Sequence, residues 1–182
     1  MITLAKWSVE DYHQIVKTGI MSDRRVELLA GKILEMSPEA PLHRRINDSV
    51  AEYLRDKFTG VAKVYESHPI TLTDSEPEPD IALVKLPVSE YKSRHPYPSD
   101  IYLLIEISDT TLEKDLNQKQ NIYAQAGILE YWVIDVKAKK LIVFQNPSTD
   151  NYELKQTYRN GEITTLAFEE ISLSVTKLIP VD

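Results

Sequence analysis

The stretch "LLIEIS", residues 103–108, belongs to the most strand-like run of this chain. Its leucines and isoleucines are typical of a strand that is buried on both faces, yet Glu106 stands in the middle of the run. An ionised carboxylate that is buried without a partner costs several kcal/mol, so the strand must carry it for a reason. The simplest reason is structural, namely that Glu106 lies near the strand end and pairs with a lysine or an arginine.

Helix and hairpin signals precede this stretch. Ser8, followed three residues later by Asp11, predicts the start of a short helix. Residues 24–37, "RRVELLAGKILEMS", alternate around a turn of alanine and glycine and predict a β-hairpin. Residues 41–58 carry an apolar side chain at every fourth position and are followed by Gly60, so we expect a helix there.

Strand signals surround and follow the stretch. We expect strands within residues 61–73, 76–86 and 100–108, a proline-rich loop over 86–99, a helix over 110–126, a strand–turn–strand unit over 130–145, and a C-terminal hairpin with Asn160 and Gly161 at its turn. Strand, helix and strand over residues 103–135 predict a right-handed crossover between parallel strands. The fold class is therefore α/β, with a mixed central sheet flanked by helices, an added N-terminal helix and hairpin, and a C-terminal hairpin.

Composition limits the possible functions. A length of 182 residues with 42% hydrophobic content predicts a single domain over residues 1–182. The chain has no cysteine, which excludes disulfides, thiolate metal sites and a cysteine nucleophile. It has neither an apolar run of about 18 residues nor a secretory signal, so we expect no membrane segment and a cytoplasmic location. The net charge of −7 argues against tight, metal-free binding of nucleic acid, although a bound metal would reverse the local sign.

A second carboxylate begins another apolar strand. Asp80 stands at the start of "DIALV", directly after Pro79. Taken singly, Asp80 also fits a turn residue after proline. Together with Glu106 on a neighbouring strand, however, it would form an oxygen-rich pocket suited to Mg²⁺ or Mn²⁺.

A lysine completes the candidate site. Asp115, Lys119 and Tyr123 are spaced four residues apart, so they share one face of the expected helix. Asp115 and Lys119 could form an ordinary exposed ion pair of little energetic weight. Alternatively, this face points back to the strand end and brings the Lys119 ammonium to the carboxylates, where it could orient a water or stabilise charge on a phosphate.

These segments resemble a known family. Asp80, Glu106 and a nearby lysine resemble the PD-(D/E)XK nuclease arrangement, and the wider sequence resembles the putative restriction endonuclease family once called domain of unknown function 820, or Uma-type. The resemblance covers about residues 8–145 and is carried by "VELLAGKILEMSP", "PEPDIALV", "LLIEISDTTLEKD" and "KQNIYAQAGILEYWVID". It implies a restriction-endonuclease-like core and a Mg²⁺- or Mn²⁺-dependent endonuclease, a hydrolase that cleaves the ester bonds of DNA.

The resemblance also implies roles for individual residues. Asp80, Glu106 and the backbone carbonyl of Ile107 would hold the metal ion, and Lys119 would position or help to deprotonate the attacking water. In the simple motif the lysine lies two residues after the second acid, but Ser108 stands there, so the lysine role would have moved to the following helix. Glu27 could complete the coordination directly or through a water, or could simply face solvent.

Other residues would support this site. Asp115 and Tyr123 lie on the face that carries Lys119. His43 could contact a phosphate or a water beside Glu27, or could be a surface histidine near a helix start. Arg44 and Arg45 could face a nucleic-acid backbone or could remain solvated.

Competing interpretations stay open at the level of sequence. The chain could be a relative that binds nucleic acid or protein without turnover, or an assembly module in which the acids serve only structure. The expected partner is DNA, and a homodimer would let paired sites cut both strands.

Overall fold

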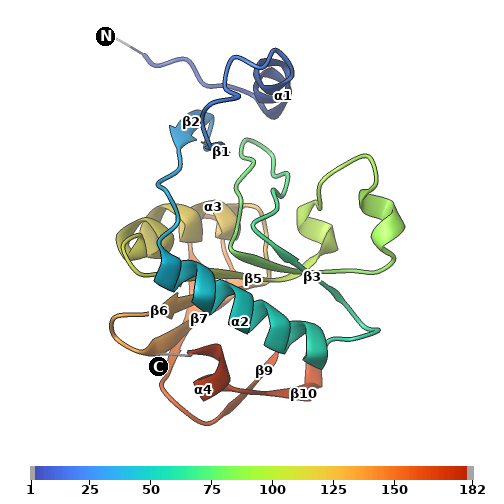
Figure 1. Ribbon diagram of the computed structural model, residues 1–182, viewed down its shortest axis with the longest axis vertical. Helices are drawn as coiled ribbons and strands as arrows, with labels where there is room; N and C mark the ends of the chain where they lie inside the picture. The colour runs from blue at the N-terminus through green and yellow to red at the C-terminus, as the bar shows by residue number, and fades with distance from the viewer. Residues whose placement is uncertain (1–2, 180–182) are drawn as a thin grey trace.

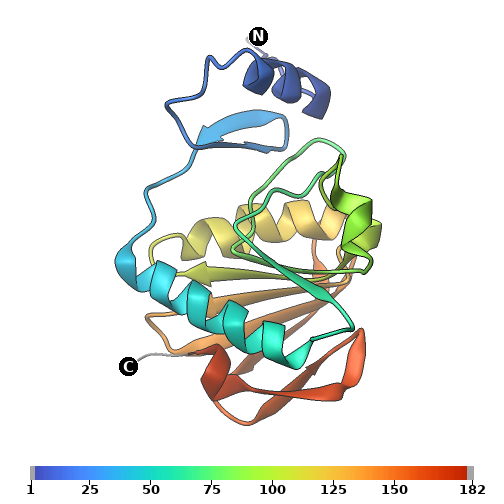
Figure 2. The ribbon, with the colours of Figure 1, turned by 45° about the vertical axis from the view of Figure 1, so that its right-hand side comes forward.

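The computed structural model describes residues 3–179 (Figure 1). The N-terminal part holds helix α1 (Val9–Lys17) and the antiparallel strands β1 (Val26–Leu29) and β2 (Lys32–Glu35). The predicted capping box is present: the Asp11 amide donates to Ser8 Oγ, and the Ser8 amide donates to the Asp11 carboxylate. Figure 2 shows this part at one end of the molecule, beyond the central sheet.

A six-stranded sheet forms the centre of the molecule, in the order β3–β4–β5–β6–β7–β8. The strands are β3 (Lys63–Glu66), β4 (Ile81–Val84), β5 (Ile101–Ser108), β6 (Glu130–Asp135), β7 (Lys140–Pro147) and β8 (Tyr152–Tyr158). Only β5 and β6 pair in parallel, and the other neighbours are antiparallel. The sheet is therefore mixed, as predicted, with the parallel pair formed by the stretch around Glu106.

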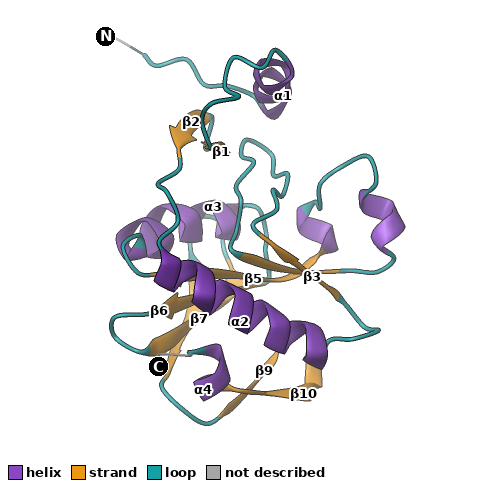
Figure 3. Cartoon of the chain, viewed as in Figure 1, coloured by secondary structure: helices purple, strands orange, loops and turns teal. Residues whose placement is uncertain are grey.

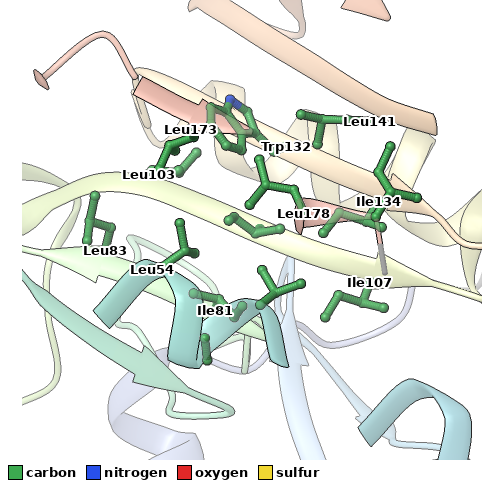
Figure 4. Close-up of a cluster of buried hydrophobic side chains, with 14 of the residues drawn as sticks. Leu54, Ile81, Leu83, Leu103, Ile107, Trp132, Ile134, Leu141, Leu173 and Leu178 are labelled. Carbon is green, nitrogen blue, oxygen red and sulfur yellow. The ribbon is translucent and has the colours of Figure 1, made fainter. Parts of the chain in front are cut away.

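One face of the sheet is covered by helix α2 (Pro41–Lys57) together with β9 (Glu162–Thr165), β10 (Phe168–Ser174) and helix α4 (Val175–Leu178). The apolar residues spaced four apart in α2, such as Val50 and Leu54, are fully buried. Figure 4 shows Leu54 on the same side of the sheet as the strand residues Ile81 and Leu103 in this cluster, with Trp132 beside Leu103. Burial of this stripe holds α2, and with it His43, against the sheet.

The opposite face is covered by the helical segment that links β5 to β6. We predicted a helix over residues 110–126. In the structure the helical segment begins at Leu112, runs as a π-helix over Lys114–Lys119, and continues as α3 (Gln120–Gln125) (Figure 3). Tyr123 packs edge-on against Tyr131 of β6, which fixes this segment on the sheet.

The C-terminal turn was predicted wrongly. Asn160 and Gly161 do not close a hairpin, because β8 pairs with β7 and β9 pairs with β10. Ile163 and Leu173 of the β9–β10 hairpin are buried against the core under α2, whereas β8 stays at the edge of the central sheet with mostly exposed side chains. The Asn160 turn therefore leads the chain from one sheet to another, because burying the apolar side chains of β9 and β10 outweighs extending the sheet edge.

Residues 61–73 were expected to hold one strand or two short ones, and they hold the single strand β3. The proline-rich loop contains, in addition, two short 3₁₀ turns, η1 (Val88–Tyr91) and η2 (Pro98–Asp100). Within residues 3–179, every helix is too short or too polar to cross a membrane.

Candidate active site

The end of β5 brings Asp80 and Glu106 together. Asp80 directly precedes β4, whose first residue Ile81 pairs with Ile105, so Asp80 lies opposite Glu106 at the sheet end. The Ile107 amide donates a hydrogen bond of 2.6 Å to Asp80 Oδ2. Because the amide and carbonyl of a strand residue point to the same side, the Ile107 carbonyl also points toward Asp80.

Glu106 forms a buried ion pair with Lys119. Glu106 Oε1 accepts hydrogen bonds of 2.8 Å from both Lys119 Nζ and the Tyr123 hydroxyl. Glu106 and Lys119 are only 2% and 5% exposed. The structural explanation for the strand glutamate, pairing with a lysine near the strand end, is therefore correct, and the partner is the lysine that the sequence singled out.

Asp115 faces the same interior and is not part of an exposed ion pair. Its Oδ2 accepts hydrogen bonds from the Ser108 hydroxyl at 2.7 Å and from the Thr111 hydroxyl at 2.6 Å. Asp115 is 2% exposed, so the interpretation of Asp115 and Lys119 as a solvated pair is wrong. Ser108, which occupies the lysine position of the simple motif, is used to orient Asp115.

The ionisation of this cluster is strongly perturbed. Burial raises the pKa of the Glu106 carboxyl and outweighs the opposing effect of the Lys119 ammonium. Burial by itself would lower the pKa of Lys119, but the charge of Glu106 and of the other carboxylates around it raises that pKa above its usual value. Burial also raises the pKa of Tyr123 well above its usual value. Lys119 therefore stays protonated and positively charged. Tyr123 keeps its hydroxyl proton and donates it to Glu106.

Glu27 reaches the site from β1. A place at the site was one of the two positions expected for it, and the other was the solvent face. Glu27 is 1% exposed, so the interpretation that it faces solvent is wrong. Its Oε1 lies 2.5 Å from Lys114 Nζ, and its Oε2 accepts a longer hydrogen bond of 3.4 Å from the Glu78 amide. Lys114 was not singled out from the sequence, because nothing in "LEKD" distinguishes it from an exposed helix lysine.

His43 lies between two carboxylates at the start of α2. Its Nε2 is 3.1 Å from Asp80 Oδ2 and its Nδ1 is 3.1 Å from Glu39 Oε1. Burial alone would lower its pKa, but the hydrogen bonds and charges of Asp80 and Glu39 prevail and raise the pKa of His43 to about 9. With 18% of its side chain exposed, His43 is a partner of Asp80 and not a surface histidine. Arg44 and Arg45, which follow it, are exposed.

These side chains line a cavity of about 390 Å³. Eight carboxylates line it, against three lysine or arginine side chains, so the cavity attracts cations and repels an unaccompanied phosphate. It is bounded by residues of the segment from β2 to α2, of the end of β5 and of the π-helical segment.

The donor set can be tested against a divalent ion. Asp80 Oδ1 and Glu106 Oε2 accept no hydrogen bond from the described residues, so each carboxylate keeps one oxygen available. In the same part of the chain, no group of three or more acidic or histidine side chains converges on one metal position. Two carboxylates and one backbone carbonyl remain, and these fit Mg²⁺, which typically keeps several waters and takes few protein ligands.

Comparisons with known proteins give the family and the fold of the chain. A family model described as "Uma2: Putative restriction endonuclease" matches residues 9–176. The fold is similar to the crystal structure of a protein described as a putative nuclease belonging to DUF820 from Anabaena variabilis ATCC 29413, with a TM-score of 0.67 and 17% sequence identity over 86% of this chain and 90% of that chain. At this identity the likeness shows the fold. Among curated proteins, no significant match is found.

Proposed function

The chain belongs to the Uma2 family of putative restriction endonucleases, and from this membership we propose that it hydrolyses phosphodiester bonds in DNA as a metal-dependent endonuclease. One observation carries the proposal: Asp80, Glu106 and Lys119 meet at one end of the central sheet, in a cavity rich in carboxylates. Asp80, Glu106 and the Ile107 carbonyl would hold Mg²⁺ or Mn²⁺. The bound ion would lower the pKa of a coordinated water and offset the charge that develops on the phosphoryl oxygens.

Lys119 supplies the positive charge of the chain at the reacting group. Hydrolysis forms a bond from a water oxygen to phosphorus and breaks one ester bond, leaving a phosphomonoester and a hydroxyl that takes up a proton. Negative charge builds on the phosphoryl oxygens as these bonds change. A buried ammonium stabilises such charge more strongly than a solvated one, because little water screens it. Lys119 also orients the water.

Other residues hold the acids in place. Tyr123 donates to Glu106, and His43 contacts Asp80, so each acid has one oxygen fixed by a neighbour. Asp115 supports the helical segment through Ser108 and Thr111. Arg44 and Arg45 lie on the exposed side of the helix that begins at the cavity, where they would contact the DNA backbone. A homodimer would place two such sites on opposite strands.

Cleavage of plasmid and single-stranded DNA tests the proposal. Wild type, Asp80→Asn, Glu106→Gln and Lys119→Met would be purified side by side and assayed with Mg²⁺, with Mn²⁺ and with chelator. A matched surface variant, Lys92→Ala, would control for purification. We expect metal-dependent cutting by wild type and by Lys92→Ala, with a loss of about 100-fold or more in the three site variants.

The outcomes separate the competing functions. Cutting that survives in Asp80→Asn would refute the site or reveal a contaminating nuclease. Metal binding by wild type without any cutting of DNA would refute the proposed activity and favour a relative that binds without turnover.

A further inference from the structure

A second ammonium lines the cavity that contains the proposed metal position, on a residue that the chemistry above does not use. Lys114 Nζ contacts Glu27 Oε1 at 2.5 Å. Glu27 is 1% exposed, while the Lys114 side chain is 31% exposed and lines the cavity. A buried carboxylate with so close a partner is neutralised by that partner, and it is not available as a free metal ligand.

Glu27 has only one strong partner in the described part of the chain. Its second oxygen accepts the Glu78 amide at 3.4 Å, which is a weak bond beside the 2.5 Å contact to Lys114. Without the Lys114 ammonium, Glu27 would be a buried anion in a cavity already lined by seven other carboxylates. Such a group would attract another cation from solution.

The local charge points the same way. Glu27, Asp80, Glu106 and Asp115 are all buried or lie at the cavity, and Lys114 and Lys119 are the ammonium groups paired among them. Each of these two ammonium groups offsets the charge of one buried carboxylate, Glu27 for Lys114 and Glu106 for Lys119.

On the basis of the proposed function, we propose that Lys114 fills the place of a second cation, so that the site binds a single divalent ion. Glu27 is then the anchor of this built-in ammonium and not a ligand of the first ion. The lysine carries one positive charge and is part of the chain, so a chelator cannot remove it. A chelator could remove a second metal ion. Because Lys114 is on the π-helix and Glu27 is on β1, the same contact holds the N-terminal hairpin against the helical segment that carries Lys119.

Counting bound Mn²⁺ on the full chain tests this inference. Free Mn²⁺ would be followed by electron paramagnetic resonance during titration, with calorimetry as a second measure. We expect one ion per chain for wild type and for the charge-conserving variant Lys114→Arg. In Lys114→Met the ammonium is lost, Glu27 becomes available, and we expect two ions. The double variant Glu27→Gln/Lys114→Met removes the anion as well and should return to one.

The outcomes distinguish this inference from the proposed function. Two ions on wild type, or a single ion on a folded Lys114→Met chain, would overturn the role of Lys114 and leave the nuclease proposal standing. No Mn²⁺ on wild type would overturn both, because the metal at Asp80 and Glu106 would then be absent. Far-ultraviolet circular dichroism of each variant would show that it is folded, and the count on wild type and Lys114→Arg needs no destabilised protein.

Discussion

Replacing Lys119 by methionine should destabilise the protein strongly. The substitution keeps a long apolar stem but removes the only ammonium that contacts Glu106 Oε1 among the described residues. At 2.8 Å and an effective dielectric constant of about 20, the attraction of the pair is roughly 6 kcal/mol. Part of it is recovered, because Glu106 keeps its hydrogen bond from Tyr123 and can take up a proton. Breaking a buried pair on one side typically costs about 3–5 kcal/mol, and we expect a loss in that range.

The matched control is the double variant Glu106→Gln/Lys119→Met, which removes both charges. Replacing a buried ion pair by neutral groups of similar size is often nearly neutral in stability, so this variant should recover most of the loss. Urea unfolding in chelator would give the free energy of unfolding for wild type, both single variants and the double variant. A loss below about 1 kcal/mol in Lys119→Met, or a double variant no more stable than that single one, would refute the reasoning from a buried, paired charge.

Three further predictions concern single residues: Tyr123, Glu130 and Gly31. Tyr123→Phe removes one donor to Glu106 and should cost about 1–2 kcal/mol in urea unfolding, while near-wild-type stability would show that this bond contributes little. Burial raises the pKa of Glu130 above 4.5, so the folded state binds the proton more readily and the free energy of unfolding falls as pH rises above that value. Glu130→Gln should flatten this slope above pH 4.5, and an unchanged slope would contradict it. Gly31→Ala should cost about 1–2 kcal/mol, because φ is +76° and the new Cβ would lie 2.9 Å from a neighbouring side chain. Thermal unfolding should show a smaller loss in Gly127→Ala, where φ is similar but the space is open.

The sequence predicted the elements whose burial is local and periodic. The helix over Pro41–Lys57 and the parallel strands around Glu106 follow from apolar spacing, and both are present. The prediction for the C-terminal turn was wrong, because an Asn-Gly pair specifies a change of chain direction but does not specify which strands pair with each other. That partner is decided by which apolar side chains, such as Ile163 and Leu173, find a place under α2, and this depends on contacts distant in sequence.

The site was predictable to the extent that it lies on regular structure. Asp80 and Glu106 were expected to converge because they stand at the ends of adjacent strands, and the register places them opposite each other. The surroundings of His43 were less predictable, since its contact with Asp80 depends on how α2 lies across the sheet. Lys114 and its contact with Glu27 were missed altogether, because the N-terminal hairpin and the helical segment are 87 residues apart.

The π-helical segment explains why one lysine was found and the other was not. Side chains five residues apart in an α-helix diverge by about 140° around the axis, so a regular helix that aimed Lys119 at Glu106 would turn Lys114 away. A π-helix closes hydrogen bonds between residues five apart and brings such side chains to the same side. Lys114 and Lys119 are the first and last residues of the π segment, and they reach Glu27 and Glu106 in the same cavity. The π-helix thus allows one short segment to present two ammonium groups to two buried carboxylates. Spacing rules based on 3.6 residues per turn cannot predict this arrangement.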